Sequence, residues 1–315
     1  MKVLQGLALS LFAAAGAASA QTIGIVTTPA GSFSNSAGQA IAKVLVDKAK
    51  LRAVVQAQAS TGFEEVESGS ADFNVSNSFD ATFFATGTGE YEGQGKHPVM
   101  RYVGALIPYR VAMHVRADSA IKTIGDLKGK RVSSDFNAQK TIGRIIAAHL
   151  ANARLSYDDV VKVPAPNVTR QAEDFMSGKV DVMFFALGSA AIKQANASVG
   201  GLRVLEVDTS AEAMKRTEAL IPGAYVLQVA PGPAIEGVAK PTHLIAFDMV
   251  MITNAKVSDD TVYRVAKALH DNKPDLVGTF PPFGLFQPQG MAKPLLGVPV
   301  HPGAMKYYKE AGLLK

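Results

Sequence analysis

The sequence predicts an α/β fold made of two similar units, each a mostly parallel sheet flanked by helices. Three observations lead to this expectation. Short β-branched runs alternate with amphipathic helical segments from Thr22 onward, and the same alternation starts again near residue 131. The composition is that of an ordinary globular protein, with 48% hydrophobic and 19% charged residues. A length of 315 residues allows one large or two medium domains.

Residues 1–20 have the features of a secretory signal peptide, and we exclude them from the fold. Lys2 supplies a basic start, an apolar run follows, and Ala18-Ser19-Ala20 has the small-x-small pattern of a cleavage site. The sequence contains no cysteine, which excludes disulfides and the cysteine that anchors a lipoprotein. No later apolar run reaches the roughly 18 residues of a membrane-spanning helix. We therefore expect a soluble periplasmic protein without a lipid anchor.

The first unit begins with a strand, a loop and a helix in Thr22–Leu45. The loop, Pro29–Asn35, is small and rich in hydroxyls, and it leads directly into the helix. Free N–H groups at the start of a helix favour an anion, so Ser32, Ser34 and Asn35 are candidates for holding a carboxylate or phosphate. Such loops also use Gly, Pro, Ser and Asn for turns and caps alone, which leaves a purely structural role open. Neither G-x-G-x-x-G nor G-x-x-x-x-G-K-[ST] is present.

The rest of the first unit continues the alternation. We expect a strand at 52–58, a short helix at 62–69 and a third strand at 72–77, which together predict parallel strands with right-handed crossovers. Ligands of such sheets lie at the carboxyl ends of strands, where Ser76, Asn77 and Ser78 follow the third strand. Two more strands, 100–107 and 110–115, are expected to join at a turn containing Tyr109 and Arg110. Arg110 is a candidate carboxylate ligand, or else a surface arginine in a loop.

The second unit repeats the pattern after a short helix that Thr123 caps and Gly129 ends. We expect strands at 131–133, 160–163, 180–185, 202–207 and 243–253, with helices at 138–151, 169–176 and 189–195. Ser258 is expected to cap a helix, and Pro302 lies at the start of the last one.

Charge and motif content argue against several functions. The formal net charge of +5 falls to +4 without Lys2 and is spread along the chain, which indicates no nucleic-acid partner and a slight bias toward anionic ligands. The six histidines are scattered, H-E-x-x-H and G-x-S-x-G are absent, and no cysteine is available as nucleophile or ligand. We therefore expect no enzyme activity, no cofactor and no metal site.

Four segments resemble a known family. The segment RADSAIKTIGDLKGKRVS, residues 116–133, resembles the crossing between the two lobes of type II periplasmic solute-binding proteins. Together with IGIVTTPAGSFSNSAGQAIAKVL, FMSGKVDVMFFALGS (175–189) and VPVHPGAMKYYKEAGL (298–313), it resembles the TAXI family of solute receptors of TRAP transporters. The resemblance covers essentially the whole chain after residue 20, and HPGAMKYYKEAG is its most specific part.

The resemblance implies a type II periplasmic binding protein fold, with the ligand cleft between two lobes. Lobe I would comprise residues 21–116 and 250–315 and lobe II residues 117–249, with hinges near Arg116 and Met249. The protein would be a monomeric receptor that captures a small organic acid or amino-acid-like ligand, expected to be anionic, and delivers it to TRAP membrane subunits. A receptor of an ABC transporter, a ligand-sensing partner of a membrane kinase and a periplasmic enzyme on the same scaffold remain alternatives.

Two expected binding loops depart from the family pattern. Phe33 and Ser34 stand where the family usually has two tyrosines, and Ser133–Thr141 replaces a glycine-rich turn. In this second loop Lys140 would restore positive charge, and Phe185 lies either in the sheet core or at the cleft wall. The expected ligand-binding residues are Ser32, Phe33, Ser34, Asn35, Asn77, Ser78, Tyr109, Arg110, Asn137, Gln139, Lys140, Thr141, Phe185 and Gly188.

Overall fold

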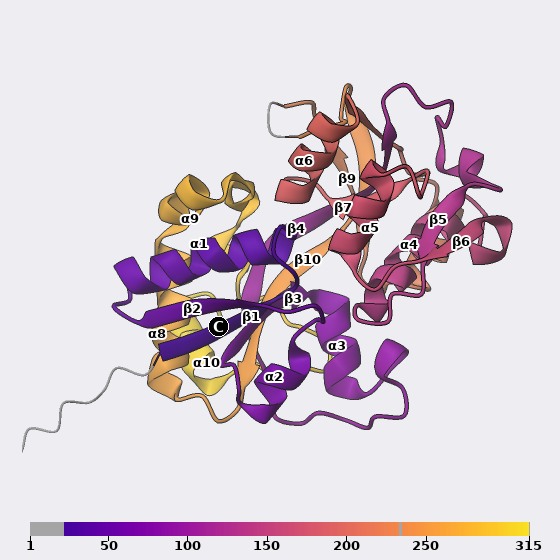
Figure 1. Cartoon of the computed structure of the whole chain (residues 1–315). Coiled ribbons are helices and arrows are strands. Elements are labelled where there is room, and N and C mark those ends of the chain that lie inside the picture. Colours follow the sequence, from indigo (N-terminus) through magenta and orange to yellow (C-terminus); the bar gives the residue numbers. More distant parts are fainter. Residues whose placement is uncertain (1–21, 233–234, 315) are drawn as a thin grey trace, which may run out of the picture.

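The computed structural model describes residues 22–232 and 235–314, so the expected signal peptide at 1–20 lies outside the described residues. The elements gather into two bodies, and two long strands run between them, β4 (Met100–Arg116) and β10 (Thr242–Asn254) (Figure 1). The first body contains the N-terminal and C-terminal parts of the described chain. The second contains most of its middle. This arrangement has the two-lobed form that the sequence predicts.

The first body is built on a sheet whose first three strands are parallel. Strands β1 (Thr22–Thr27), β2 (Arg52–Ala57) and β3 (Phe73–Asn77) pair in the order β2-β1-β3. The crossovers between them are α1 (Phe33–Asp47) and α2 (Phe63–Ser68). The predicted β-α-β-α-β start is therefore confirmed. Beyond β3 the sheet continues with β10 and β4, which both pair in the antiparallel direction.

Strand β4 corrects the expectation of two strands joined by a turn. It is one continuous strand of 17 residues that contains Pro108, Tyr109 and Arg110. Its register with β10 shifts between the pairs Ala105–Val250 and Pro108–Asp248, which marks a bulge. A bulge tolerates a proline, because the missing N–H lies where the ladder is already interrupted. From Val111 onward β4 pairs with a strand of the second body, so it changes partners before the predicted crossing at Arg116.

The second body combines one parallel pair with three antiparallel additions. Strands β5 (Arg131–Ser134) and β6 (Val161–Pro164) are parallel, as expected. By contrast, β7 (Met183–Ala186) and β8 (Leu202–Val204) pair antiparallel with β4, and β9 (Tyr225–Val229) pairs antiparallel with β10. The expectation of a mostly parallel sheet is wrong for these three strands. Its helices are α4 (Lys140–Asn152), α5 (Val168–Met176), α6 (Ala190–Ser198) and α7 (Ala211–Glu218).

The remaining elements complete the first body and the connections. They are the helices α3 (Ser78–Thr86), α8 (Asp259–Asp271), α9 (Lys273–Thr279) and α10 (Pro302–Glu310), and the 3-10 turns η1 (Gly89–Tyr91), η2 (Ile124–Leu127), η3 (Tyr157–Asp159), η4 (Pro281–Leu285) and η5 (Pro288–Gly290). Sequence patterning did not indicate α3, α7, α9 or β9.

The C-terminal HPGA motif has a structural role in the described chain. His301 is buried and caps α10, because its Nδ1 accepts a hydrogen bond from the N–H of Gly303 at 3.1 Å. A Cβ on Gly303 would lie 2.2 Å from the carbonyl oxygen of Asp259, so only glycine allows α10 to approach α8 this closely. The Tyr308 hydroxyl donates to the Val103 carbonyl and ties α10 to β4.

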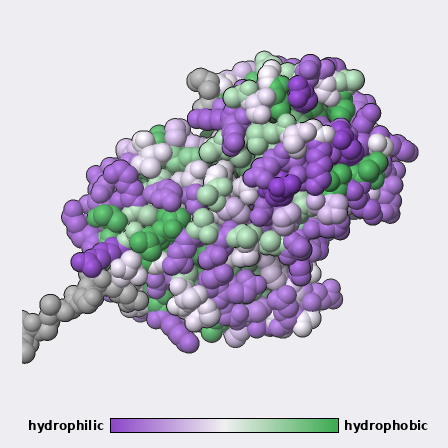
Figure 2. Space-filling view, viewed as in Figure 1, coloured by the Kyte–Doolittle hydropathy of each residue, from purple (hydrophilic) through white to green (hydrophobic). Residues whose placement is uncertain are grey.

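The surface on the side of Figure 2 is mainly hydrophilic over both bodies. Hydrophobic residues gather over the region of α1 and β2, two elements that carry the exposed Val46 and Val54 (Figure 2). Among the residues described, no helix has the length and apolarity needed to cross a bilayer.

Candidate functional site

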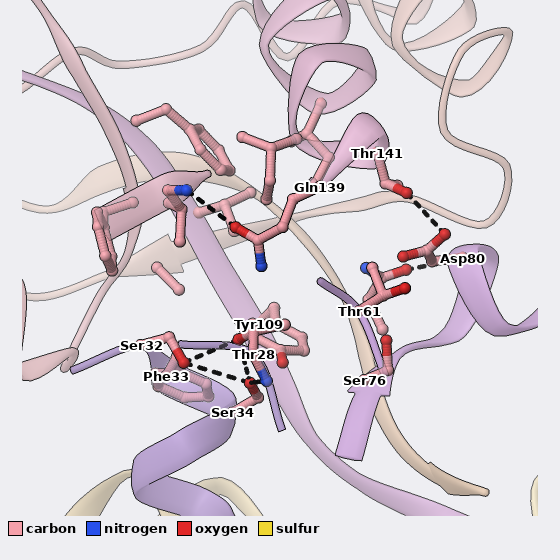
Figure 3. A pocket seen from close by; sticks show the side chains of 18 of the residues that line it. Thr28, Ser32, Phe33, Ser34, Thr61, Ser76, Asp80, Tyr109, Gln139 and Thr141 are labelled. Carbon is pink, nitrogen blue, oxygen red and sulfur yellow. Dashed lines mark hydrogen bonds between the residues drawn. The ribbon is translucent and has the colours of Figure 1, made fainter. Parts of the chain in front are cut away.

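A cavity lies where elements of both bodies meet at the carboxyl ends of β1 and β3. The first body contributes its walls through the loop before α1, the end of β3 and the start of α3, and the second body contributes the starts of α4 and α5 and strand β7 (Figure 3). The part of this cavity that the centre of a water-sized sphere can reach has a volume of about 70 Å³. Since one water needs roughly 10–15 Å³ on this measure, the cavity has room for on the order of five water-sized groups.

Three hydroxyls form a cluster at the start of α1, which we call the hydroxyl cluster: Thr28, Ser32 and Ser34. The Thr28 hydroxyl donates to Ser32 Oγ at 2.8 Å, and Ser34 Oγ accepts the Thr28 N–H at 3.2 Å. Ser32 is also the N-cap of α1, because its Oγ accepts the N–H of Asn35 at 3.2 Å. Hydroxyls beside the positive end of a 15-residue helix suit a carboxylate or another acceptor group.

Aromatic rings form the floor below this cluster. Tyr109 lies between Phe33 and Phe247, with ring centroids 5.1 Å and 5.4 Å away. Burial raises the pKa of Tyr109, a hydrogen bond with Ser34 opposes the shift, and the nearby Asp80 carboxyl adds to it. The phenol therefore stays protonated and is available as a hydrogen-bond donor. The second body adds apolar side chains from Phe184, Phe185, Ile142, Ile145 and Val168.

Gln139 brings a fixed amide donor into the cavity. Its Oε1 accepts the backbone N–H of Val168 at 2.9 Å, which orients the side chain. The amide nitrogen then faces the cavity, opposite the hydroxyl cluster (Figure 3). This side chain therefore presents its amide donor to any molecule bound there.

Asp80 and Thr141 join the two bodies across the cavity. The Thr141 hydroxyl, on α4, donates to Asp80 Oδ1, on α3, at 2.6 Å, and both side chains are buried (Figure 3). Burial raises the pKa of Asp80 to about 7, hydrogen bonds from Thr141 and Tyr91 oppose the shift, and Glu90 and Glu64 add to it. Among the described residues that line the cavity there is no lysine, arginine or histidine.

The structure brings eight of the expected ligand-binding residues together around this cavity. They are Ser32, Phe33, Ser34, Asn77, Tyr109, Gln139, Thr141 and Phe185. Phe185 thus lies both in the sheet core and at the cavity wall. Asn77 acts as the N-cap of α3, where its Oδ1 accepts the Asp80 N–H at 2.7 Å.

Three of the other expected residues, Arg110, Asn137 and Lys140, do not line the cavity. On strand β4, Tyr109 and Val111 line the cavity, so the side chain of Arg110 between them lies on the other face of the sheet. Burial lowers the pKa of Arg110. Asn137 and Lys140 line an open groove on the outer side of α4, and Lys140 therefore adds no positive charge to the cavity.

The last three expected residues have local roles. The Asn35 amide donates to Thr27 Oγ1 at 3.0 Å within the first body. Ser78 lines a separate groove beside Asp248. Gly188 has φ +87°, and a Cβ there would lie 2.9 Å from Pro282 Cγ, so its contribution is close packing between β7 and the C-terminal segment.

Sequence reasoning missed several lining residues, among them Thr28, Thr61 and Asp80. Thr28 adjoins the expected loop Pro29–Asn35, so the hydroxyl content that marks this loop as a candidate site applies to Thr28 as well. Asp80 is the third residue of α3, where an acidic residue is ordinarily explained by helix capping. No local signal distinguishes it, since its partner Thr141 lies 61 residues further along the chain.

Solved structures with low sequence identity share this fold. One described as a periplasmic transporter is 12% identical, with 94% of each chain covered and a TM-score of 0.60. The periplasmic binding protein BugD is 13% identical, with 93% of this chain and 98% of that chain covered and a TM-score of 0.59. The substrate-binding protein of an amino acid ABC transporter is 12% identical, with 82% of this chain and 99% of that chain covered and a TM-score of 0.50.

The predicted solute-binding fold is therefore confirmed, while membership of the TAXI family stays a prediction. A family model described as the NMT1-like family matches residues 25–312. Because this match spans nearly all of the described residues, the chain belongs to the NMT1-like family.

Proposed function

We propose that the protein is a periplasmic receptor that binds one small organic molecule between its two bodies and delivers it to membrane transport subunits. The observation that carries this proposal is the cavity, which takes walls from both bodies and has donors on one side and apolar side chains on the other. Pockets of this kind, mostly apolar with a few convergent polar groups, are typical of small-molecule sites.

Contacts between the bodies support a receptor that closes around its ligand. Thr141 donates to Asp80 at 2.6 Å beside the cavity. Further out, Arg144 forms an ion pair with Glu90, and its guanidinium lies 5.2 Å from the ring centroid of Phe83. A ligand that contacts both bodies adds interactions that exist only in the closed form, and it thereby shifts the population toward that form.

The hydroxyl cluster favours binding over catalysis. Its serine and threonine hydroxyls hydrogen-bond to one another, with Ser32 and Ser34 Oγ 3.4 Å apart. Nucleophilic serines require a general base within hydrogen-bond reach, and no histidine or lysine lines the described cavity. We infer a binding role for these hydroxyls.

TRAP membrane subunits are the proposed partners, on the basis of the sequence resemblance in the lobe-crossing and C-terminal segments. An ABC transporter is the second candidate, favoured by the shared fold with the substrate-binding protein of an amino acid ABC transporter. Co-purification of the ligand-loaded protein with the membrane subunits of each class separates the two. Ligand-stimulated ATP hydrolysis by the assembled complex would favour the ABC candidate.

The receptor function is tested by a thermal-shift screen over amino acids, 2-oxo acids, hydroxy acids and dicarboxylates. A ligand at about 100 times its Kd stabilises the folded form by about 2.7 kcal/mol, which is a clear shift in melting temperature. We expect one chemical class to stabilise the protein, with a stoichiometry of one by calorimetry. A screen in which no compound stabilises the protein would contradict the proposal.

A further inference from the structure

We propose that the cavity selects a small zwitterion with an apolar body, an α-amino acid being the simplest example, whose ammonium group contacts Asp80 and whose carboxylate faces Gln139 and the hydroxyl cluster. This inference rests on the proposed receptor function and specifies the chemical class of its ligand. It narrows the expected organic acid or amino-acid-like ligand to a molecule that carries both charges.

The first argument is that Asp80 is a buried carboxyl that lacks a cationic partner in the described structure. It is 1% exposed and is hydrogen-bonded to Thr141 and Tyr91, both neutral, and it takes part in no ion pair among the residues described. The charged side chains that act on it, Glu90 and Glu64, are acidic. A buried carboxylate is costly without an opposite charge, so a ligand ammonium group would supply what the protein does not.

The second argument is that the groups on the other walls are donors. The amide nitrogen of Gln139 faces the cavity, and the Tyr109 phenol is held protonated by burial. The N-terminus of α1 adds partial positive charge beside Ser32 and Ser34. These groups suit a carboxylate. The polar walls are thus divided, with an acceptor at Asp80 and donors elsewhere.

The third argument is size and polarity. The volume that the centre of a water-sized sphere can reach is only about 70 Å³, and Phe184, Phe185 and Ile145 contribute an apolar wall. A short aliphatic side chain fits this wall. A dicarboxylate would place its second carboxylate on the apolar wall or against Asp80, and both positions are unfavourable.

The inference is tested by calorimetry on the purified full chain with ligands that share one skeleton. L-valine, 2-hydroxy-3-methylbutanoate and 3-methyl-2-oxobutanoate differ only at the group that would meet Asp80, and L-alanine, L-leucine and succinate vary size and charge. A hydrogen bond between two charged groups adds to affinity, so we expect the best amino acid to bind at least about tenfold more tightly than its 2-oxo acid at pH 8.

Asp80→Asn keeps the shape of the side chain and removes its charge. We expect this substitution to weaken amino-acid binding at pH 8 by about tenfold or more. Affinity for the 2-oxo acid should not fall and should rise at this pH, because the variant has no ionised carboxylate to repel it. Asp158→Asn is the control, because the Asp158 side chain is 91% exposed in the second body. Affinities of Asp158→Asn should match those of the wild type.

The pH dependence gives a readout that does not require a variant. The titratable groups around Asp80 are Tyr91 and Glu90 on η1, Glu64 on α2 and Tyr109 on β4. Because burial raises the pKa of Asp80 to about 7, ionisation is incomplete near neutral pH. An ammonium group favours the ionised form, so amino-acid affinity should rise between pH 5.5 and 8. Affinity for the 2-oxo acid should fall over the same range, because the protonated carboxyl donates to it.

The outcomes separate this inference from the receptor function. An amino acid that binds most tightly, weakens on Asp80→Asn and gains affinity with pH supports the inference. If a 2-oxo acid or succinate binds most tightly, or if Asp80→Asn leaves amino-acid affinity unchanged, the inference is overturned and the receptor function stands. If none of these compounds binds and the wider screen is also negative, both proposals fall.

Discussion

Replacing Asp80 with asparagine should change how the stability of the ligand-free protein depends on pH. Burial raises the pKa of Asp80 from 3.8 to about 7, so between these values the folded state binds a proton that the unfolded state has lost. Stability from this group is fully present below pH 3.8 and is lost as the pH rises toward 7. Asparagine does not ionise, so the variant should become progressively more stable relative to the wild type as the pH rises.

The magnitude follows from the size of the pKa shift. Each pH unit over which only the folded state holds the proton is worth about 1.4 kcal/mol, so from pH 5 to pH 8 the difference in unfolding free energy should change by about 3 kcal/mol in favour of the variant. Chemical denaturation of both proteins at half-unit pH steps measures this difference. Other titrating groups cancel in the comparison. A difference that stays constant across this range would show that Asp80 is already ionised, and the account of the cavity would be wrong.

Three further outcomes follow from the packing of the two bodies. Gly188→Ala should lower the unfolding free energy by about 2 kcal/mol or more in denaturant titrations, since Gly188 has φ +87° and a Cβ would meet Pro282. Gly178 is the control: it has φ +75° but open space around it, so Gly178→Ala should cost about 1 kcal/mol. Equal costs for the two variants would refute the packing argument. Arg144→Met removes the ion pair with Glu90, and we expect the variant to have a larger radius of gyration by small-angle scattering and ligand affinity weakened by about three- to tenfold. An unchanged radius and affinity would contradict a role of this ion pair in holding the two bodies closed. Burial lowers the pKa of His114 to about 4, so this side chain alone should cost the folded state about 3 kcal/mol as the pH falls from 6.5 to 4. The stability of His114→Gln relative to the wild type should rise by about that amount over this range in denaturant titrations; a constant difference would show that the histidine is not responsible.

Sequence patterning predicted elements that have a clear helical period or a long apolar run. Helix α1 has an amphipathic period and strand β10 is a long apolar run, and both lie where the pattern puts them. Helix α3 is short and largely apolar, with Phe84 on a different face from Phe79 and Phe83, so no helical period is visible. Pro108 suggested a turn, but the partner strand accommodates it at a bulge.

The candidate site could be predicted to the level of loops and not of single side chains. Both predicted loops do line the cavity, through Ser34 in the first body and Gln139 in the second. Which of two adjacent side chains faces the cavity depends on how the strand or helix is rotated, as Tyr109 and Arg110 on β4 show. Asp80, the carboxyl that we propose contacts the ligand, meets Thr141 from the other body, 61 residues further along the chain, and tertiary contacts of that kind leave no local pattern.

The central claim, that a small molecule binds in the cavity between the two bodies, is tested most directly by filling that cavity. Ala186 lies in β7 at the cavity wall and is 7% exposed, so Ala186→Leu should occupy the space of the ligand while the fold is kept. Calorimetry should give one binding site for the best compound of the screen in the wild type and affinity reduced by about 100-fold or more in the variant, a cost of about 2.7 kcal/mol. Equal affinity in a folded Ala186→Leu protein would show that the ligand binds elsewhere and would contradict the claim.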